Sequence, residues 1–163
     1  MDDRISARDR LAVTGEFRER RYPSGPLRSR TRDIAELTAL WTHSLANGKT
    51  SLSLGGSFAE EWATQERIDG DASIWSVRSS LDHAFSDSLD AFFFLEYWEE
   101  GYDEERPDFS TDPSLLVQRS DDLVYAGGGL IWSFAPGWTL RPAFEYDWEN
   151  SNIPALAYSK TEA

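Results

Sequence analysis

The sequence predicts an all-β protein, an antiparallel up-and-down transmembrane β-barrel, and three observations carry this prediction. Apolar and polar residues alternate over successive segments of the chain. The connections between these segments are short and long in turn, and aromatic residues gather toward both ends of the segments. Barrels of the bacterial outer membrane combine these features, because their short turns face the periplasm and their long loops face outside.

The clearest alternation runs over residues 138–148. One face of this expected strand carries Trp138, Leu140, Pro142, Phe144, Tyr146 and Trp148. The other face carries Thr139, Arg141, Ala143, Glu145 and Asp147. Since successive side chains of a strand point to opposite faces, one face is apolar and the other can be wet. Pro142 cannot donate a hydrogen bond to a neighbouring strand, so a bulge or an unpaired edge is expected there.

The same alternation predicts about eight strands, each long enough to cross a membrane at a tilt. They are expected at residues 10–20, 31–45, 50–62, 72–82, 89–99, 121–134 and 138–148, with an eighth beginning near residue 157. Residues 46–49 predict a tight turn, because Asn47-Gly48 supplies the positive φ that a two-residue hairpin needs. Further short turns are expected near residues 85–88 and 135–137, and loops at 65–71, 101–120, 150–154 and around Pro23, Gly25 and Pro26.

Length and composition restrict the alternatives. The 163 residues predict a single domain over 1–163, either a β-barrel or the C-terminal portion of one with its last strand truncated. A net charge of -13 excludes a basic, nucleic-acid-binding surface as the expected interface. With no cysteine there is neither a disulfide framework nor a thiolate metal site. No apolar signal region follows the first residues, so we expect either a protein that stays inside the cell or a fragment or mature region. The pattern that stops at residues 159–163 favours a fragment.

Charged residues on the inward faces of the expected strands form the first group of candidate site residues. They are Glu16, Arg18, Glu36, Arg78, Glu96, Arg141 and Glu145. They predict either a charged lumen that selects a solute or a salt-bridge network that plugs a narrow barrel. About eight strands enclose little more than side chains, and unpaired buried charge is costly, so a small barrel favours the plug. In a larger barrel the same residues would line a pore.

Aromatic residues near the strand ends form the second group. The predicted membrane-interface residues are Trp41, Trp62, Tyr97, Trp138, Tyr146 and Trp148. Amphipathic rings prefer the two interfaces of a bilayer, although aromatic residues are also simply common in strands.

No catalytic or metal-binding group is predicted. His43 and His83 both lie beside short turns, and no motif places a nucleophile or an acid next to them. Asp82 precedes His83, but adjacent strand residues point apart. The acidic segments 103–105 and 121–122 lack the spacing of a calcium-binding loop and are expected to be solvated. We therefore expect neither enzyme activity nor a cofactor.

Three C-terminal segments carry a family resemblance: residues 137–146 (GWTLRPAFEY), 151–154 (SNIP) and 158–160 (YSK). They resemble the last hairpin of proteobacterial outer-membrane barrels. The chain is most similar to barrels that follow tetratricopeptide repeats, including the surface lipoprotein assembly modifier family, and to β-barrel porins. The resemblance covers about residues 81–160, without the final aromatic residue or the upstream helical repeats of those proteins. It transfers no functional residue.

The resemblance implies a protein of the bacterial outer membrane, in contact with the lipid bilayer and lipopolysaccharide. It also implies a protein partner at the outer loops or at upstream periplasmic repeats. The expected function is transport or export of a solute or protein. One alternative is a structural or surface-interaction barrel with a plugged lumen. Another is a soluble β-barrel that binds a small apolar ligand, which would fold in plain buffer.

Overall fold

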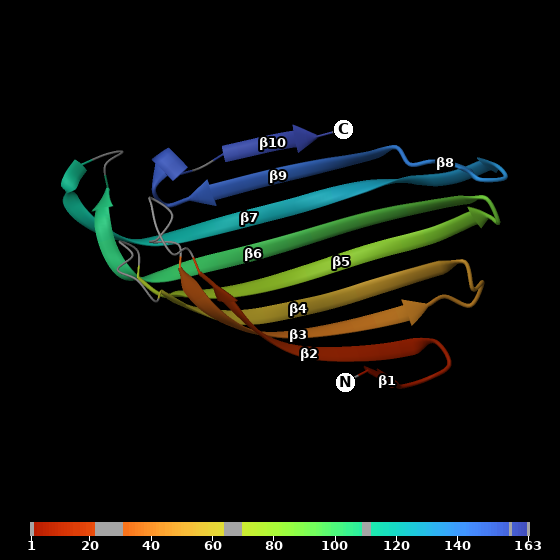
Figure 1. Ribbon diagram of the computed structural model, residues 1–163, viewed down its shortest axis with the longest axis horizontal. Helices are drawn as coiled ribbons and strands as arrows, with labels where there is room; N and C mark the ends of the chain where they lie inside the picture. The colour runs from red at the N-terminus through yellow and green to blue at the C-terminus, as the bar shows by residue number, and fades with distance from the viewer. Residues whose placement is uncertain (1, 22–30, 64–69, 109–111, 157, 163) are drawn as a thin grey trace.

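The computed structural model describes residues 2–21, 31–63, 70–108, 112–156 and 158–162. Over these residues the chain forms one antiparallel sheet, drawn in Figure 1. The prediction of an all-β, antiparallel, up-and-down fold is confirmed. The described strands form an open sheet rather than a closed barrel. No helix in the described part of the chain is long and apolar enough to cross a membrane.

The strands follow one another through the sheet in the order of the sequence. They are β1 (Asp2–Arg4), β2 (Asp9–Arg20), β3 (Arg32–Ser44), β4 (Thr50–Ala63), β5 (Ala72–Ser86), β6 (Leu89–Asp108), β7 (Asp112–Ala135), β8 (Trp138–Leu140), β9 (Ala143–Ser151) and β10 (Tyr158–Glu162). A 3-10 turn, η2 (Pro154–Leu156), precedes β10. Both β8 and β9 pair with β7, so they form one interrupted strand, and β2 to β10 then count as the eight strands predicted.

The register gives the sheet two chemically different faces. One line of directly paired residues across the strands contains Leu11, Trp41, Leu54, Leu95 and Tyr146, so these side chains share a face. We call this the apolar face, and the opposite one the polar face. The large exposed side chains of the apolar face are Phe17, Leu37, Leu54, Phe58, Trp62, Trp75, Val77, Leu81, Phe85, Phe93, Leu95, Leu130, Trp132, Phe134, Trp138, Leu140, Phe144 and Tyr146.

Burial is concentrated on the polar face, near the end of the sheet where β4 leads into β5 and β6 into β7. We call this the loop end, and the opposite end, with the short connections, the turn end. The strand residues with buried side chains are Ile34, Ala59, Glu61, Ala72, Ser76, Tyr102, Asp121 and Ser151. A water-soluble sheet usually buries its apolar face and exposes its polar one. This sheet does the reverse.

The predicted loop over residues 101–120 is wrong, because most of it is strand. β6 continues to Asp108 and β7 begins at Asp112. The register shifts between Gly101 and Glu105, and beyond that point β6 and β7 pair only with each other. A two-stranded extension has no third strand or core to select an alternating pattern, so its polar sequence resembles a loop. The predicted loop residues 22–30 and 64–69 lie outside the described residues.

The turn predicted at residues 46–49 is confirmed. β3 ends at Ser44 and β4 begins at Thr50. Gly48 has a positive φ of 64°, whereas no residue other than glycine has positive φ in the described chain. The Asn47 side-chain oxygen accepts hydrogen bonds from the backbone N–H groups of Lys49 (2.9 Å) and Thr50 (3.2 Å). Asn47 therefore stabilises the turn as a side-chain acceptor, a role that asparagine often has in turns.

A bulge or an unpaired edge is predicted at Pro142, and the structure shows the second: residues 141–142 belong to no strand, and no bulge forms. The pairs Trp132–Leu140 and Gly129–Ala143 have the same register on both sides of the interruption, so no residue is inserted. The backbone N–H of Leu130 donates to the Pro142 carbonyl at 3.0 Å. Because proline lacks an N–H group, the strand pairing is interrupted at Pro142. The side chains before and after it still point to the same faces of the sheet.

The glycine run 127–129 marks a close approach of neighbouring backbones. A Cβ atom on Gly129 would lie 2.5 Å from the Pro142 carbonyl oxygen. We expect Gly129→Ala to destabilise the protein by about 1–3 kcal/mol, because backbone cannot move aside as a side chain can. Gly15→Ala is the matched control, since no atom lies within 4 Å of its added Cβ. Urea unfolding of the two variants in detergent micelles measures the difference, and equal stabilities would contradict the prediction.

Candidate functional site

All seven predicted lumen residues lie on the polar face. The register places Arg78 opposite Glu96, and Glu16 opposite Glu36, with Arg18, Arg141 and Glu145 at positions of the same parity. The structure brings three of the seven together. Arg18 contacts Glu36 at 2.5 Å and Glu16 at 3.3 Å. Arg141 and Glu145 are exposed and lie away from this group.

A second charged cluster at the loop end of the polar face was missed by the sequence prediction. Arg32 contacts Glu61 at 2.8 Å, and Glu61 is 1% exposed. Arg119 forms an ion pair with the equally buried Asp121 and lies 3.8 Å from Glu149. The predicted strand at residues 121–134 corresponds to β7. If its alternation had been continued back from residue 121 to residue 119, Arg119 would have been placed on the polar face.

The ring of Tyr102 lies below the Arg119 guanidinium, whose Cζ is 4.6 Å from the ring centroid. This is a cation–π contact in a largely desolvated setting. The Tyr102 hydroxyl donates a hydrogen bond to the Glu100 carboxylate. Burial raises the pKa of Tyr102, and the neighbouring Glu100 charge raises it further. Burial also raises the pKa of Glu100, although the hydrogen bond from Tyr102 partly opposes this effect.

The raised pKa of Glu100 predicts a pH-dependent stability. A carboxyl group whose folded-state pKa is raised favours folding in its protonated form, and this contribution is lost as pH rises above the unfolded value of about 4.3. We therefore expect Glu100→Gln to raise the melting temperature at pH 7 and to have little effect below about pH 4, where Glu100 is also neutral. Thermal melts at both values test this, and an equal effect at both would contradict it.

Between these clusters the polar face is hollow. The hollow has a volume of about 340 Å³ and spans β2 to β7, where Leu123 lines it. Its lining includes both Arg–Glu pairs, together with Glu96, Trp98 and Glu100 of β6. Trp98 is 39% exposed, and in the main described sheet it is the one large exposed hydrophobic residue on the polar face. The hollow therefore combines an aromatic surface with charges of both signs.

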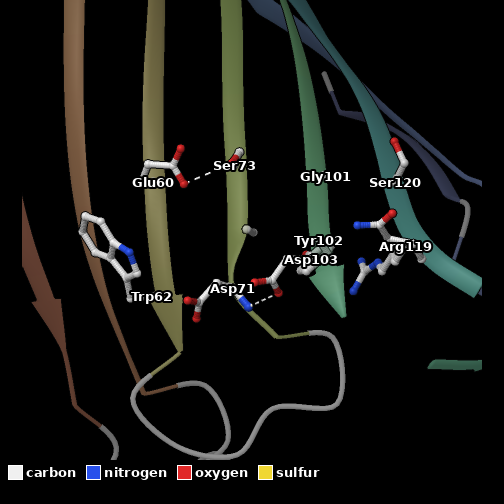
Figure 2. A pocket seen from close by; sticks show the side chains of 11 residues that line it. Glu60, Trp62, Asp71, Ser73, Gly101, Tyr102, Asp103, Arg119 and Ser120 are labelled. Atoms are coloured by element: carbon white, nitrogen blue, oxygen red, sulfur yellow. Dashed lines mark hydrogen bonds between the residues drawn. The ribbon is translucent and has the colours of Figure 1, made fainter. Parts of the chain in front are cut away.

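Figure 2 shows another hollow, of about 600 Å³, beyond the loop end of the sheet. Trp62, Asp71 and Asp103 line it together with Arg119. The Asp71 backbone N–H donates to the Asp103 side chain at 2.7 Å, which holds the start of β5 against β6. The carboxylate of Asp103 in this hollow thus has a structural role, because it joins the ends of two neighbouring strands.

The predicted interface aromatics all lie on the apolar face. By register, Tyr146 shares a line with Trp41, and Tyr97 lies in line with Trp148 through Val124. Trp62 stands near the end of β4, and Trp138 begins β8. The structure thus puts all six on the face opposite to the charged residues.

Two aromatic rings of the apolar face, one of them predicted, hydrogen-bond to acids through their polar atoms. The Tyr97 hydroxyl donates to Asp122 at 2.7 Å, and the Trp75 indole donates to Glu99 at 3.1 Å. The two rings also contact each other, with centroids 5.3 Å apart. Trp75 is a further interface candidate, outside the six predicted residues. Rings with an apolar body and a polar, wet edge suit a membrane interface.

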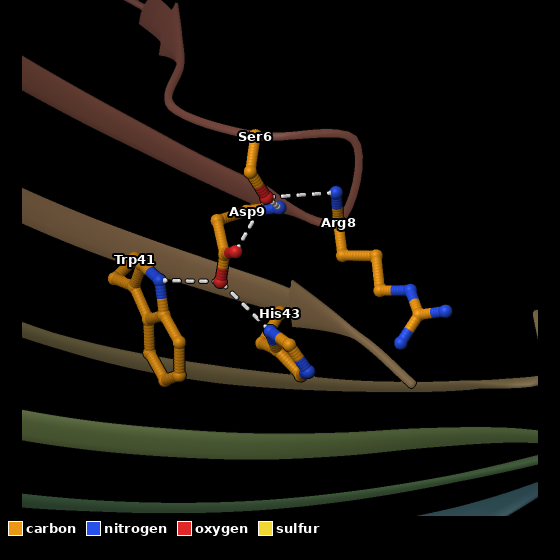
Figure 3. A network of polar contacts seen from close by, with 5 residues as sticks. All are labelled: Ser6, Arg8, Asp9, Trp41 and His43. Atoms are coloured by element: carbon orange, nitrogen blue, oxygen red, sulfur yellow. Dashed lines mark hydrogen bonds and ion pairs between the residues drawn. The ribbon is translucent and has the colours of Figure 1, made fainter. Parts of the chain in front are cut away.

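Figure 3 shows a polar network at the turn end around Asp9. The carboxylate of Asp9 accepts hydrogen bonds from the Ser6 hydroxyl (2.6 Å) and the Trp41 indole (3.2 Å). Nδ1 of His43 lies 2.7 Å from the same carboxylate. These hydrogen bonds, with that from Ser6 the largest cause, lower the pKa of Asp9.

This network contains serine, aspartate and histidine, but not in the order that nucleophilic catalysis needs. In a catalytic triad, histidine lies between serine and the acid and takes the serine proton. Here Asp9 lies between Ser6 and His43, so it fixes both side chains instead. His83 contacts Thr50 at 2.8 Å. Among the residues with described positions, no group of three or more His, Cys, Asp or Glu could hold a metal ion.

Comparison of the chain with known protein families, curated proteins and solved structures finds no match. The likeness to outer-membrane barrels therefore remains a prediction from the residues.

Proposed function

We propose that the chain forms the wall of an outer-membrane β-barrel that transports or exports a solute or protein. In this proposal the apolar face contacts the lipid bilayer, and lipopolysaccharide in its outer leaflet, while the polar face lines the lumen. The observation that carries it is the exposed apolar face of a single-layered sheet, bounded by aromatic side chains. An exposed apolar surface of this extent marks an interaction with a membrane or a partner.

The stagger of the strands supports this orientation. The register line through Ser44, at the end of β3, meets β5 at Asp82 and β7 at Gly129. β5 and β7 end at Ser86 and Ala135, progressively farther beyond that line. From one strand to the next, the turn thus shifts along the strand direction by about 1.5 residues, which is about 5 Å. Neighbouring strands are about 4.8 Å apart, so the two distances are nearly equal. Turns at one membrane surface then require a strand tilt of about 45°, as in membrane barrels.

The width of the apolar band supports it as well. Val124 lies opposite Tyr97 near the loop end, and Phe134 lies on the same strand near the turn end. Ten residues of strand span about 33 Å, which a 45° tilt reduces to about 23 Å. This is close to the apolar band of about 25 Å in outer-membrane barrels.

A structural barrel with a plugged lumen is the second candidate. It is favoured by the buried loop-end cluster, in which Arg32 and Arg119 hold the carboxylates of Glu61 and Asp121. If these pairs fill the lumen of a narrow barrel, they prevent passage. In that case the extended hairpin of β6 and β7 would offer a surface to a protein partner outside the cell.

Planar bilayer recordings distinguish the two candidates. The full chain, folded in detergent, is added to a bilayer and its current is measured in potassium chloride. Discrete, reproducible conductance steps are expected for the transport barrel. Folded protein that inserts but carries no current supports the plugged scaffold, and heat-unfolded protein is the control for detergent artefacts.

A further inference from the structure

The hollow on the polar face has a floor of small side chains between two walls of long ones. Its floor includes Ser57 and Ala59 of β4 and Ser76 of β5. The hydroxyl oxygens of Ser57 and Ser76 are 2.9 Å apart and hydrogen-bonded to each other. The two serine hydroxyls thus satisfy each other's hydrogen-bonding capacity. Because all three side chains are small, they leave open space above the sheet for a solute.

The wall on the β6 side is a tryptophan between two acids. Glu96, Trp98 and Glu100 alternate along one strand and therefore project from the same face, about 7 Å apart. Trp98 is 39% exposed beside the hollow. Glu96 lies opposite Arg78 in the register, yet its carboxylate forms no ion pair or hydrogen bond with any described residue. The β6 wall thus presents an accessible ring and an unneutralised carboxylate.

The wall on the opposite side is already balanced in charge. Arg18 is held by Glu36, and Arg32 is held by Glu61. Arg20 is exposed at the rim. Two of the three guanidinium groups that line the hollow are therefore compensated by their own carboxylates, whereas Glu96 is not.

Charge on the neighbouring strands points the same way. The polar face of β9 carries Glu145, Asp147 and Glu149 at successive inward positions. A cation inside the barrel would be attracted to the half of the polar face formed by β6 to β9. An anion would be repelled from the same half.

We propose that this hollow binds an organic cation, an ammonium or guanidinium group, over the Trp98 ring and between Glu96 and Glu100. This inference rests on the proposed function and names the class of solute. A cation above an aromatic face is attracted by the ring, most strongly for tryptophan. A carboxylate on each side adds charge-assisted hydrogen bonds to the N–H groups of the solute.

The test is isothermal titration of the full chain, folded in detergent micelles, with arginine amide as the probe and glucose as the neutral control. We expect saturable binding of arginine amide and none of glucose. Trp98→Leu and Glu96→Gln are each expected to weaken binding at least ten-fold. Phe94→Leu, on the same strand and face but outside the hollow, is the matched control and is expected to leave binding unchanged.

The outcomes separate this inference from the proposed function. Folded, conducting protein that does not bind arginine amide, or binds it equally well in Trp98→Leu, overturns the cation site alone. Equal binding of glucose also overturns it, in favour of a neutral sugar site. Saturable binding that needs Trp98 and Glu96 in a protein without conductance supports the site and overturns transport. A chain that folds only without detergent overturns both.

Discussion

Phe144→Arg is expected to destabilise the folded protein in a lipid bilayer by about 2–4 kcal/mol. Phe144 is 50% exposed on the apolar face, between the Trp148 end of β9 and the Trp138 turn. This places it near the middle of the proposed lipid-facing band, where an arginine must leave water or deform the bilayer. Urea titration of the protein folded in phosphatidylcholine vesicles, with tryptophan emission as the readout, measures the difference.

The control for this variant is Glu145→Arg, which places the same side chain one residue away on the polar face. Its stability is expected to stay within about 1 kcal/mol of the unmodified protein, since the arginine can remain in water. Equal effects of the two variants would show that the two faces are not lipid and lumen. The same comparison in a protein folded without lipid would give no large cost at Phe144.

Arg32→Met is expected to destabilise the protein by about 3–5 kcal/mol. Arg32 contacts Glu61 at 2.8 Å, and Glu61 is 1% exposed, so removal of the guanidinium leaves a buried carboxylate without its cation. The physical cost comes from this desolvated charge rather than from the lost attraction. Denaturant unfolding in detergent micelles gives the free energy of unfolding.

A double variant tests this explanation. Adding Glu61→Leu to Arg32→Met removes the buried charge and is expected to recover most of the lost stability. Arg21→Met is the matched control: Arg21 pairs with Asp33, but its side chain is 45% exposed, so little or no loss of stability is expected. If the double variant is no more stable than Arg32→Met, the cluster does not depend on charge compensation.

The faces of the strands could be predicted from the sequence because alternation depends only on the geometry of one strand. Each of the seven predicted lumen residues lies on the polar face, and each of the six interface aromatics lies on the apolar face. The strand ends also agree within a few residues where a third strand lies alongside, as in β3 and β4.

The partners of the charged side chains could not be predicted, because they depend on register between strands. Arg18 meets Glu36 only because β2 and β3 pair with Arg18 opposite Ile34. The loop-end cluster had a further obstacle. Arg119 lies in the two-stranded extension of β6 and β7, where no neighbouring core imposes the alternation that identifies a strand.

Contact between the apolar face and lipid is tested by comparing folding of the chain with and without detergent. The full chain is diluted from urea into buffer alone and into buffer with detergent micelles, then followed by circular dichroism and by gel migration with and without heating. A β-sheet spectrum and a compact, heat-sensitive band that require detergent are the predicted result. A stable, monomeric β-protein in buffer alone would contradict the account and would favour a soluble barrel.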